Sequence, residues 1–376
     1  ESEGVFLVAA NDGQLLQAWD RIPTSPAVTQ VRAIIEGLLV KSQLRAAEAR
    51  LKLYNLSRQS SSELMRHLLD ALLAHEGWKR CDGCRGQQPG PENRCPIWEN
   101  YQRMQDALLR ERLTDLLELC DRSGFHLPVR QLLILASNML LGHPEAKDAM
   151  MRCHDVPKLV QKGRTAAGAL YRNAFGENLP PGRRASTEVF EIVGRFGVGE
   201  ETSNRIDNLL TYGSDDSRLQ PLFDELVRSD PVYGAHREYV EAQSRYLEGS
   251  NIERAPDFRE ALAAQRQRLF FTVPPARVDA LALWELTVFQ FAGEYLAKVL
   301  RPVLRGDARV EKRIVGRLVR GLNRVFTGLL TTEERQLFLA SSGSYSQARV
   351  SRIAEHQVSV EPNRGEKVVI EFDGGG

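Results

Sequence analysis

Residues 104–120 read MQDALLRERLTDLLELC, and the apolar side chains in this stretch recur every three or four positions. That spacing places them on one face of an α-helix. The apolar positions are Met104, Leu108, Leu109, Leu113, Leu116 and Leu117. We predict a single helix from Trp98 to Cys120, and the same periodicity along most of the chain predicts a mainly α fold.

Helical periodicity continues on both sides of this stretch. Upstream, Ser60–Ser62 followed by Glu63 is typical of a helix start, and we expect this helix to run to Trp78. Downstream, His126-Leu-Pro-Val-Arg130 opens a helix that continues to Gly142, with Pro128 in its first turn. Linkers are predicted at Pro180–Gly182 and Gly213–Asp216, and further helices at Leu219–Val227, Pro231–Leu247, Phe258–Phe270, Arg277–Leu300 and Val310–Leu330.

The C-terminal end of the chain changes character. Short strands are predicted at Gln336–Ala340, Val358–Val360 and Lys367–Phe372. We place these strands, together with the helices that precede them, in a C-terminal helical domain with a small β element at residues 154–376.

Three of the five cysteines lie close together upstream of residue 104. Cys81-Asp-Gly-Cys84 is followed by Cys95. Two cysteines separated by two residues can place both sulfur atoms on one tetrahedral metal ion. We therefore predict a structural zinc site, with Cys153 as the fourth ligand and His154, His75 and Cys120 as the other candidates for that place. A reduced thiol cluster without metal and a disulfide are the alternatives.

The composition is that of an ordinary soluble globular protein, with 42% hydrophobic and 26% charged residues. A net charge of +1 argues against a uniformly basic, nucleic-acid-coating surface. Five cysteines, an odd number that is mostly clustered, fit a reducing compartment such as the cytoplasm. No apolar run approaches the roughly 20 residues that a membrane span requires, so no membrane partner is expected.

Residues 4–13, GVFLVAANDG, form an unbroken apolar run that ends in a polar turn. Such a run is typical of a parallel strand that is buried on both faces. Helices are expected at Gln14–Trp19 and Val31–Ala49, and a second strand at Leu51–Leu56. Because a strand–helix–strand unit needs further parallel strands, we expect these to precede residue 1.

The apolar strand that ends in Asn11, VFLVAANDG, resembles the fourth core strand of AAA-type P-loop ATPases. The order of the elements that follow, up to about residue 150, is similar to that core and its helical lid. With YNLSR (54–58), CDGC (81–84), CPIWEN (95–100) and LVRGLNRVFTGLL (318–330), the chain resembles the C-terminal part of an ATPase associated with DNA phosphorothioation-dependent restriction. The resemblance implies a part of the ATPase core at residues 1–58 and a helical lid with a zinc knuckle at 59–153.

The resemblance also implies roles for four polar residues. Asn11 would be the sensor that contacts the γ-phosphate or the attacking water. Arg130, within LPVRQLL, stands where the lid helix carries an arginine that reaches the nucleotide. Arg45 and Arg50 precede the second strand, where such ATPases place an arginine that reaches a neighbouring subunit's nucleotide, which implies a homo-oligomer. The alternatives are a simple polar turn at Asn11, and for the arginines surface positions or pairing of Arg130 with Glu118 or Asp121.

The chain departs from the ATPase pattern in one respect. It contains no G-x-x-x-x-G-K-[ST] loop, and no run of acidic residues ends an apolar strand to hold Mg²⁺. We therefore expect the residues that bind the phosphates of ATP and its Mg²⁺ to lie upstream of residue 1. Residues 1–376 alone are not expected to hydrolyse ATP.

A basic run lies between residues 301 and 324, with eight basic residues against two acids and a local net charge of +6. Five of its arginines share one face of the predicted helix, opposite an apolar stripe. They are Arg309, Arg313, Arg317, Arg320 and Arg324. Because like charges repel, such a face favours an anionic partner, and the DNA phosphate backbone is the usual one. A solvated face, or one paired with acids such as Glu333 and Glu334, is the alternative.

These observations predict ATP-dependent work on DNA within a restriction or anti-phage defence system, with other subunits of that system as partners. The alternative is a non-enzymatic, zinc-stabilised helical scaffold that binds a protein or RNA partner.

Overall fold

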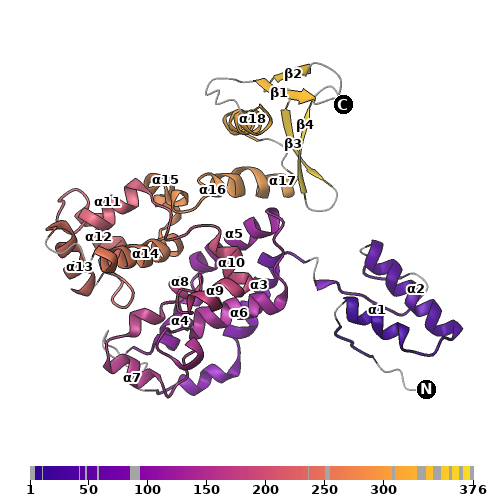
Figure 1. The fold of residues 1–376 in the computed structure, drawn as a ribbon, viewed down its shortest axis with the longest axis horizontal. Coiled ribbons are helices and arrows are strands. Elements are labelled where there is room, and N and C mark those ends of the chain that lie inside the picture. Colours follow the sequence, from indigo (N-terminus) through magenta and orange to yellow (C-terminus); the bar gives the residue numbers. More distant parts are fainter. Residues whose placement is uncertain are drawn as a thin grey trace.

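The computed structural model describes residues 5–10, 12–41, 43–46, 49–56, 59–84, 94–235, 237–249, 255–306 and 310–327, and the strands within 336–372. The fold is mainly helical, as the apolar periodicity predicts (Figure 1). In the described part of the chain, no helix is long and apolar enough to cross a membrane.

Two N-terminal helices, α1 (Asp12–Asp20) and α2 (Pro26–Lys41), pack on each other and lie apart from the other helices in Figure 1. Arg32 ties them together with an ion pair of 2.8 Å to Asp20 at the end of α1. It also pairs with Glu36 one turn further along α2, at 2.7 Å.

The two strands predicted in the N-terminal region do not form in this structure. Residues 5–10 have no regular secondary structure, and Val5 to Val8 are almost wholly exposed. Residues 51–56 carry only an isolated bridge between Lys52 and Arg45. The physical reason is that a strand needs a neighbouring strand for its backbone N–H and C=O groups. Residues 5–10 have none among the described residues, and residues 51–56 meet only the short segment at Leu44 and Arg45.

A central helical body follows. Its first half comprises α3 (Ser61–Leu73), η2 (Glu76–Cys81), α4 (Pro96–Met104), α5 (Ala107–Arg122), α6 (Val129–Leu141), η5 (Lys147–Ala149), α7 (Val156–Gln161), η6 (Thr165–Gly168), α8 (Leu170–Asn173), α9 (Pro181–Ser186) and α10 (Glu188–Gly194). Its second half comprises α11 (Asn204–Tyr212), α12 (Gln220–Phe223), η7 (Asp224–Arg228), α13 (Arg237–Leu247), α14 (Ala255–Thr272), η9 (Pro275–Arg277), α15 (Val278–Leu281), η10 (Leu283–Leu286), α16 (Ala292–Tyr295), η11 (Leu296–Leu300) and α17 (Arg301–Leu304).

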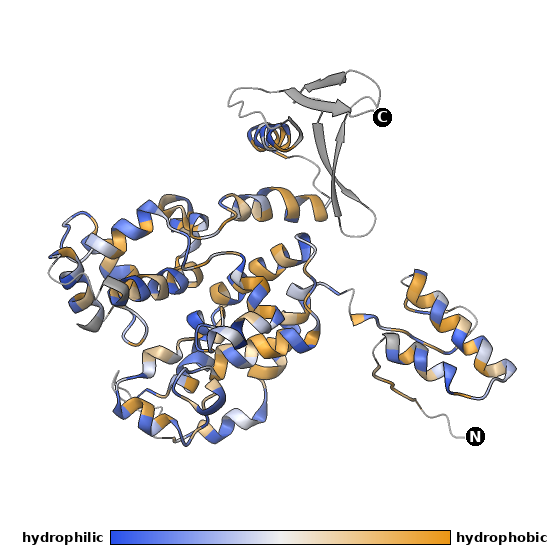
Figure 2. Ribbon diagram, in the orientation of Figure 1, coloured by the Kyte–Doolittle hydropathy of each residue, from blue (hydrophilic) through white to orange (hydrophobic). Residues whose placement is uncertain are grey.

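One apolar core unites most of these helices. It runs from Met65 on α3 to Leu300 on η11, and it spans the predicted domain boundary at residue 153. Helix α3 packs against α5 and α6, and α14 packs against α5 and α8. Each contributing helix turns an apolar stripe inward and leaves polar residues outside, and Figure 2 shows both kinds of residue on these helices.

Three helices predicted as continuous are broken. The helix predicted to run to Trp78 ends at Leu73, and the separate η2 begins at Glu76. The helix predicted from Trp98 to Cys120 is divided at Asp106, whose carboxylate accepts hydrogen bonds from the backbone N–H groups of Leu108 and Leu109 and so starts α5. The helix predicted from Arg277 to Leu300 is interrupted by a loop at residues 287–291. The predicted linker at Pro180–Gly182 is instead the start of α9, because proline suits the first turn of a helix.

The C-terminal part comprises α18 (Lys312–Thr327) and two separate antiparallel hairpins. The first joins β1 (Gln336–Ser341) to β2 (Arg349–Ala354), with Gln336 opposite Ala354. The second joins β3 (Val358–Asn363) to β4 (Lys367–Phe372), with Val358 opposite Phe372. Three of these strands were predicted and β2 was not. Helix α18 contacts β1, and its apolar side packs on Val299 and Val303.

Candidate metal centre and basic helix

The four cysteines predicted as zinc ligands come from three places in the fold. Cys81 ends η2, and Cys84 follows in a tight turn in which the Cys84 N–H donates to the Cys81 carbonyl at 2.9 Å. Gly83 in that turn has φ of +71°, a conformation that glycine adopts without strain. Cys95 directly precedes α4, and Cys153 lies in an exposed turn before α7.

A small apolar cluster holds these segments together. It contains Ile97 from α4 and Met151, Val156 and Leu159 from the chain around α7, with Cys95 and Trp78 packed at its edge. Because residues from both sides of the cysteine group share this cluster, the packing brings Cys95 toward the turn that carries Cys153.

Electrostatic interactions couple Cys81 to Cys84 and Cys153, and Cys95 to Cys81 and Cys153. Burial raises the pKa of Cys81, and the charges of Cys153 and Cys84 raise it further. Burial likewise raises the pKa of Cys95, where Cys153 and Cys81 again add to the rise. The backbone N–H groups of Trp98 and Ile97 act in the opposite direction, because both hydrogen-bond the Cys95 sulfur. A dication would relieve the repulsion among the thiolates.

The thiols are not arranged around one position that a metal ion could occupy. All five cysteines of the chain are free thiols. Among the described residues, no three His, Cys, Asp or Glu side chains are grouped tightly enough to hold a metal ion. Coordination would therefore require side-chain rotations that turn the sulfur atoms onto one centre. Four thiols on short turns, one of them already accepting two N–H bonds, are a donor set that suits tetrahedral zinc.

The other candidates for the fourth ligand have contacts of their own, of which the one made by His154 leaves its second ring nitrogen open. His75 accepts a hydrogen bond from the Gly77 N–H at 3.0 Å, and His154 pairs with Asp155 at 3.4 Å. Cys120 is fully buried on α5, and burial raises the pKa of its thiol to about 12. Cys153 contributes to the raised pKa of both Cys81 and Cys95.

The residues assigned to a nucleotide site lie in different parts of the structure. Asn11 lies outside the described residues. Arg45 and Arg50 are exposed in the segment after α2, whereas Arg130 is exposed in the first turn of α6, within the central body. Arg130 has no ion pair with the acids suggested for it, because Asp121 accepts hydrogen bonds from Ser61 and Glu118 pairs with Arg122.

The basic face of α18 is partly paired. Arg313 contacts Glu294 on α16 at 3.0 Å, and Arg317 forms a tighter bidentate pair with the same carboxylate. Partial burial of Glu294 raises its pKa, but Arg317 and the neighbouring cations outweigh this and lower it overall. The guanidinium of Arg317 also lies over the ring of Phe291, 5.0 Å from its centroid.

Two arginines of this face have no acidic partner in the described part of the chain, and Glu333 and Glu334, the acids named as an alternative, lie outside it. Arg320 is half-buried and Arg324 is exposed, and neither has an ion pair with any residue that the structure describes. They continue the stripe of Arg313 and Arg317 along α18, at helical intervals of three and four residues. Arg309 lies outside the described residues.

Sequence reasoning missed Glu294, the acid that pairs with two of these arginines and offsets part of their charge. Its position on an expected unbroken helix gave no signal that it would face α18. No protein-family model matches the chain, and no curated protein or solved structure is significantly similar to it.

Proposed function

We propose that this chain binds DNA through α18 as part of an ATP-dependent protein of a restriction or anti-phage defence system. In this proposal a structural zinc ion, held by Cys81, Cys84, Cys95 and Cys153, stabilises the helical body. The setting is the cytoplasm, and the partners are DNA, other subunits of the system and further copies of the chain.

The observation that carries the DNA-binding proposal is the pair Arg320 and Arg324 on one stripe of α18. Burying the apolar side of α18 against Val299 and Val303 fixes which side of the helix these arginines occupy. Side chains that are not engaged with an acid are free to neutralise phosphates and release counterions. Arg313 and Arg317 contribute less to phosphate binding, because Glu294 already offsets part of their charge.

The ATP-dependent part of the proposal rests on the resemblance of residues 4–150 to an AAA-type core and lid. The exposed apolar run from Val5 to Val8 supports it, because a run of that composition is favoured inside a sheet rather than in water. In this assignment ATP and Mg²⁺ bind together with a phosphate-binding loop that residues 1–376 do not contain.

The direct test is the affinity of the chain for a labelled DNA duplex. Replacing both Arg320 and Arg324 by alanine should weaken binding by a similar factor for two duplexes of unrelated sequence, because phosphate contacts carry no sequence information. The matched control is Arg228→Ala with Arg245→Ala. It removes the same charge from exposed arginines on η7 and α13 that already pair with acids. Equal affinities of the two double variants would contradict the proposal.

A second candidate function is a zinc-stabilised helical scaffold without enzymatic activity. The pairing of Arg313 and Arg317 with Glu294 favours it, because it removes charge from the face that DNA would contact. In that case the chain would bind no duplex even at low salt, where electrostatic binding is strongest.

A further inference from the structure

The loop between η10 and α16, residues 287–291 (TVFQF), exposes an unusual group of large apolar side chains. Val288 is 47%, Phe289 45% and Phe291 62% exposed. Isolated exposed apolar residues are common, but three within four positions form a contiguous patch of the kind that marks a binding surface.

The backbone holds this loop in place. Thr287 is buried, and its hydroxyl donates to the Trp284 carbonyl at 2.9 Å while accepting from the Phe289 N–H at 3.1 Å. The Val288 N–H donates to the Phe196 carbonyl at 2.9 Å. Gly293 lets α16 approach Trp284, because a Cβ there would lie 2.0 Å from the indole nitrogen. The hydrogen-bonded backbone therefore fixes the positions at which the aromatic side chains are exposed.

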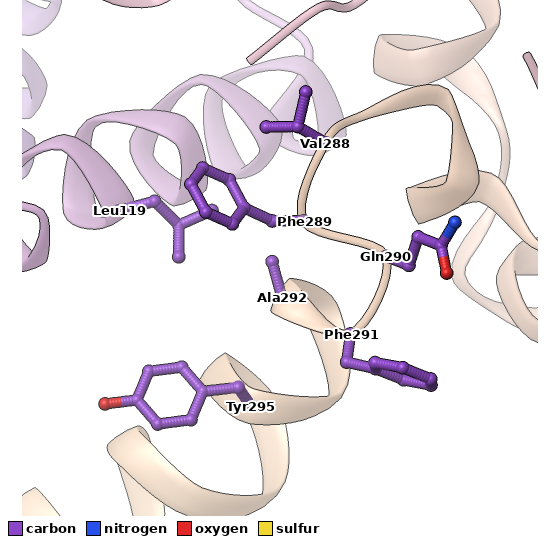
Figure 3. Close-up of a pocket in the computed structure, with 7 residues that line it drawn as sticks. All are labelled: Leu119, Val288, Phe289, Gln290, Phe291, Ala292 and Tyr295. Atoms are coloured by element: carbon purple, nitrogen blue, oxygen red, sulfur yellow. The ribbon is translucent and has the colours of Figure 1, made fainter. Parts of the chain in front are cut away.

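A cavity of about 420 Å³ lies at this loop. Its lining residues are Leu119, Val288, Phe289, Gln290, Phe291, Ala292 and Tyr295. Figure 3 shows Phe289 and Tyr295 pointing toward the side of Leu119, while Gln290 and Phe291 point the other way. The lining therefore has two aromatic side chains on one side of the loop and one on the other. Its polar side-chain groups are the Gln290 amide and the Tyr295 hydroxyl.

The arginine stripe of α18 passes the edge of this cavity at Arg317. Arg317 covers part of Phe291, 5.0 Å from the ring centroid, and leaves most of that residue exposed. Arg320 and Arg324 follow on the same stripe, within about 10 Å along the helix axis at 1.5 Å per residue. A ligand that fits both features carries an aromatic ring and, a few ångströms away, negative charge.

We propose that the 287–291 loop and its cavity bind an unpaired nucleobase of single-stranded nucleic acid, while Arg320 and Arg324 contact the neighbouring phosphates. This inference rests on the proposed DNA-binding function and adds that the chain prefers single-stranded to double-stranded nucleic acid.

The features of the cavity distinguish this ligand from a duplex. A base in a duplex is stacked on both faces and paired along one edge, so it cannot stack on an exposed aromatic side chain without being extruded. A base in a single strand presents both faces for stacking, and aromatic platforms next to a cationic groove are the usual means of binding it. The Gln290 amide lies on the same side of the loop as Phe291, where it is the polar group nearest to a base stacked on that ring.

The test compares three labelled probes on the full chain: a thymidine oligonucleotide of about twelve nucleotides, an abasic oligonucleotide of the same length, and a duplex. The inference predicts that the thymidine strand binds about tenfold more tightly than the abasic one, although both carry the same phosphates. Phe291→Ala should abolish most of this difference and leave the affinity for the abasic strand unchanged. Phe291→Trp should retain it.

Tyr212→Ala is the matched control, because it removes a 49% exposed aromatic residue from α11, outside the cavity. Equal affinities of wild type for the thymidine and abasic strands would overturn this inference while leaving the proposed function standing. Failure to bind any of the three probes at low salt would overturn the proposed function itself. If instead Phe291→Ala left nucleic-acid binding intact but abolished self-association in sedimentation, the patch would be a protein contact and the inference would be wrong.

Discussion

Arg103 on α4 and Asp230, 127 positions later in the chain, join through two parallel hydrogen bonds of 2.7 Å each. Both side chains are largely buried, and Arg268 reaches the same carboxylate at 3.4 Å. Asp230 also accepts hydrogen bonds from the N–H groups of Val232 and Tyr233. This network fixes the first half of the helical body against the second.

Removing one partner of this pair should be costly. Asp230→Asn leaves the buried Arg268 without its acidic partner and Arg103 with Glu99 alone, and we expect a loss of about 3–5 kcal/mol in the free energy of unfolding. The measurement is urea denaturation. Asp224→Asn is the control, because Asp224 forms an exposed pair with Arg228, and its loss should cost no more than about 1 kcal/mol. Similar midpoints for the two variants would contradict the structural role of the network.

The same network predicts a pH dependence. Burial raises the pKa of Asp230, but hydrogen bonds and charge from Arg103, with the charge of Arg268, outweigh it and hold the pKa at about 2, against an ordinary value of 3.8. A depressed pKa in the folded state stabilises the protein above the unfolded-state pKa. This contribution, about 2 kcal/mol, should be present at neutral pH and disappear as the pH falls from about 5 to about 2. Asp230→Asn should remove this part of the acid sensitivity, and denaturation curves at several pH values for both proteins would test it.

The zinc prediction concerns metal content. Protein purified without chelator should contain about one zinc ion per chain, and Cys81→Ser or Cys153→Ser should lower both the zinc content and the melting temperature. Cys120→Ser should leave the zinc content unchanged, because Cys120 is buried in the main core away from the cluster. Elemental analysis that finds no metal, with Cys81→Ser melting like wild type, would refute the zinc assignment.

The nucleotide assignment makes a separate prediction for a chain that also carries a phosphate-binding loop. There Asn11→Ala should lower kcat about a hundredfold with little change in ATP affinity, because a sensor acts mainly on the transition state. Arg130→Ala should weaken ATP binding. Gln131→Ala is the control for Arg130, because this neighbouring side chain already hydrogen-bonds Glu188. Wild-type ATPase activity in both Asn11→Ala and Arg130→Ala would remove these two roles.

The sequence predicted the helical class and most helix positions because apolar periodicity directly reflects which face of a helix is buried. It could not show where helices break, since the interruption at Asp106 depends on a carboxylate turning onto two backbone N–H groups. The expected strands at residues 4–13 and 51–56 illustrate a further limit. An apolar run indicates burial, but a strand forms only where another strand supplies hydrogen bonds.

At the candidate sites, too, the sequence predicted local patterns but not contacts between segments distant in the chain. The spacing of Cys81, Cys84 and Cys95 predicted a local group of thiols, whereas the proximity of Cys153 depends on packing between Ile97 and the segment around α7. The arginine stripe was readable from helical spacing alone. Its pairing with Glu294, and the exposed aromatic loop beside it, depend on contacts between elements distant in sequence.

The central claim is that α18 contacts DNA phosphates, and the salt dependence of duplex affinity tests it most directly. The measurement is the dissociation constant between about 50 mM and 200 mM salt for wild type and for the Arg320→Ala, Arg324→Ala double variant. Two lost phosphate contacts should reduce the slope of log affinity against log salt by about two units, because fewer counterions are released on binding. A slope identical to that of wild type would mean that these arginines contact no phosphate, and it would contradict the account.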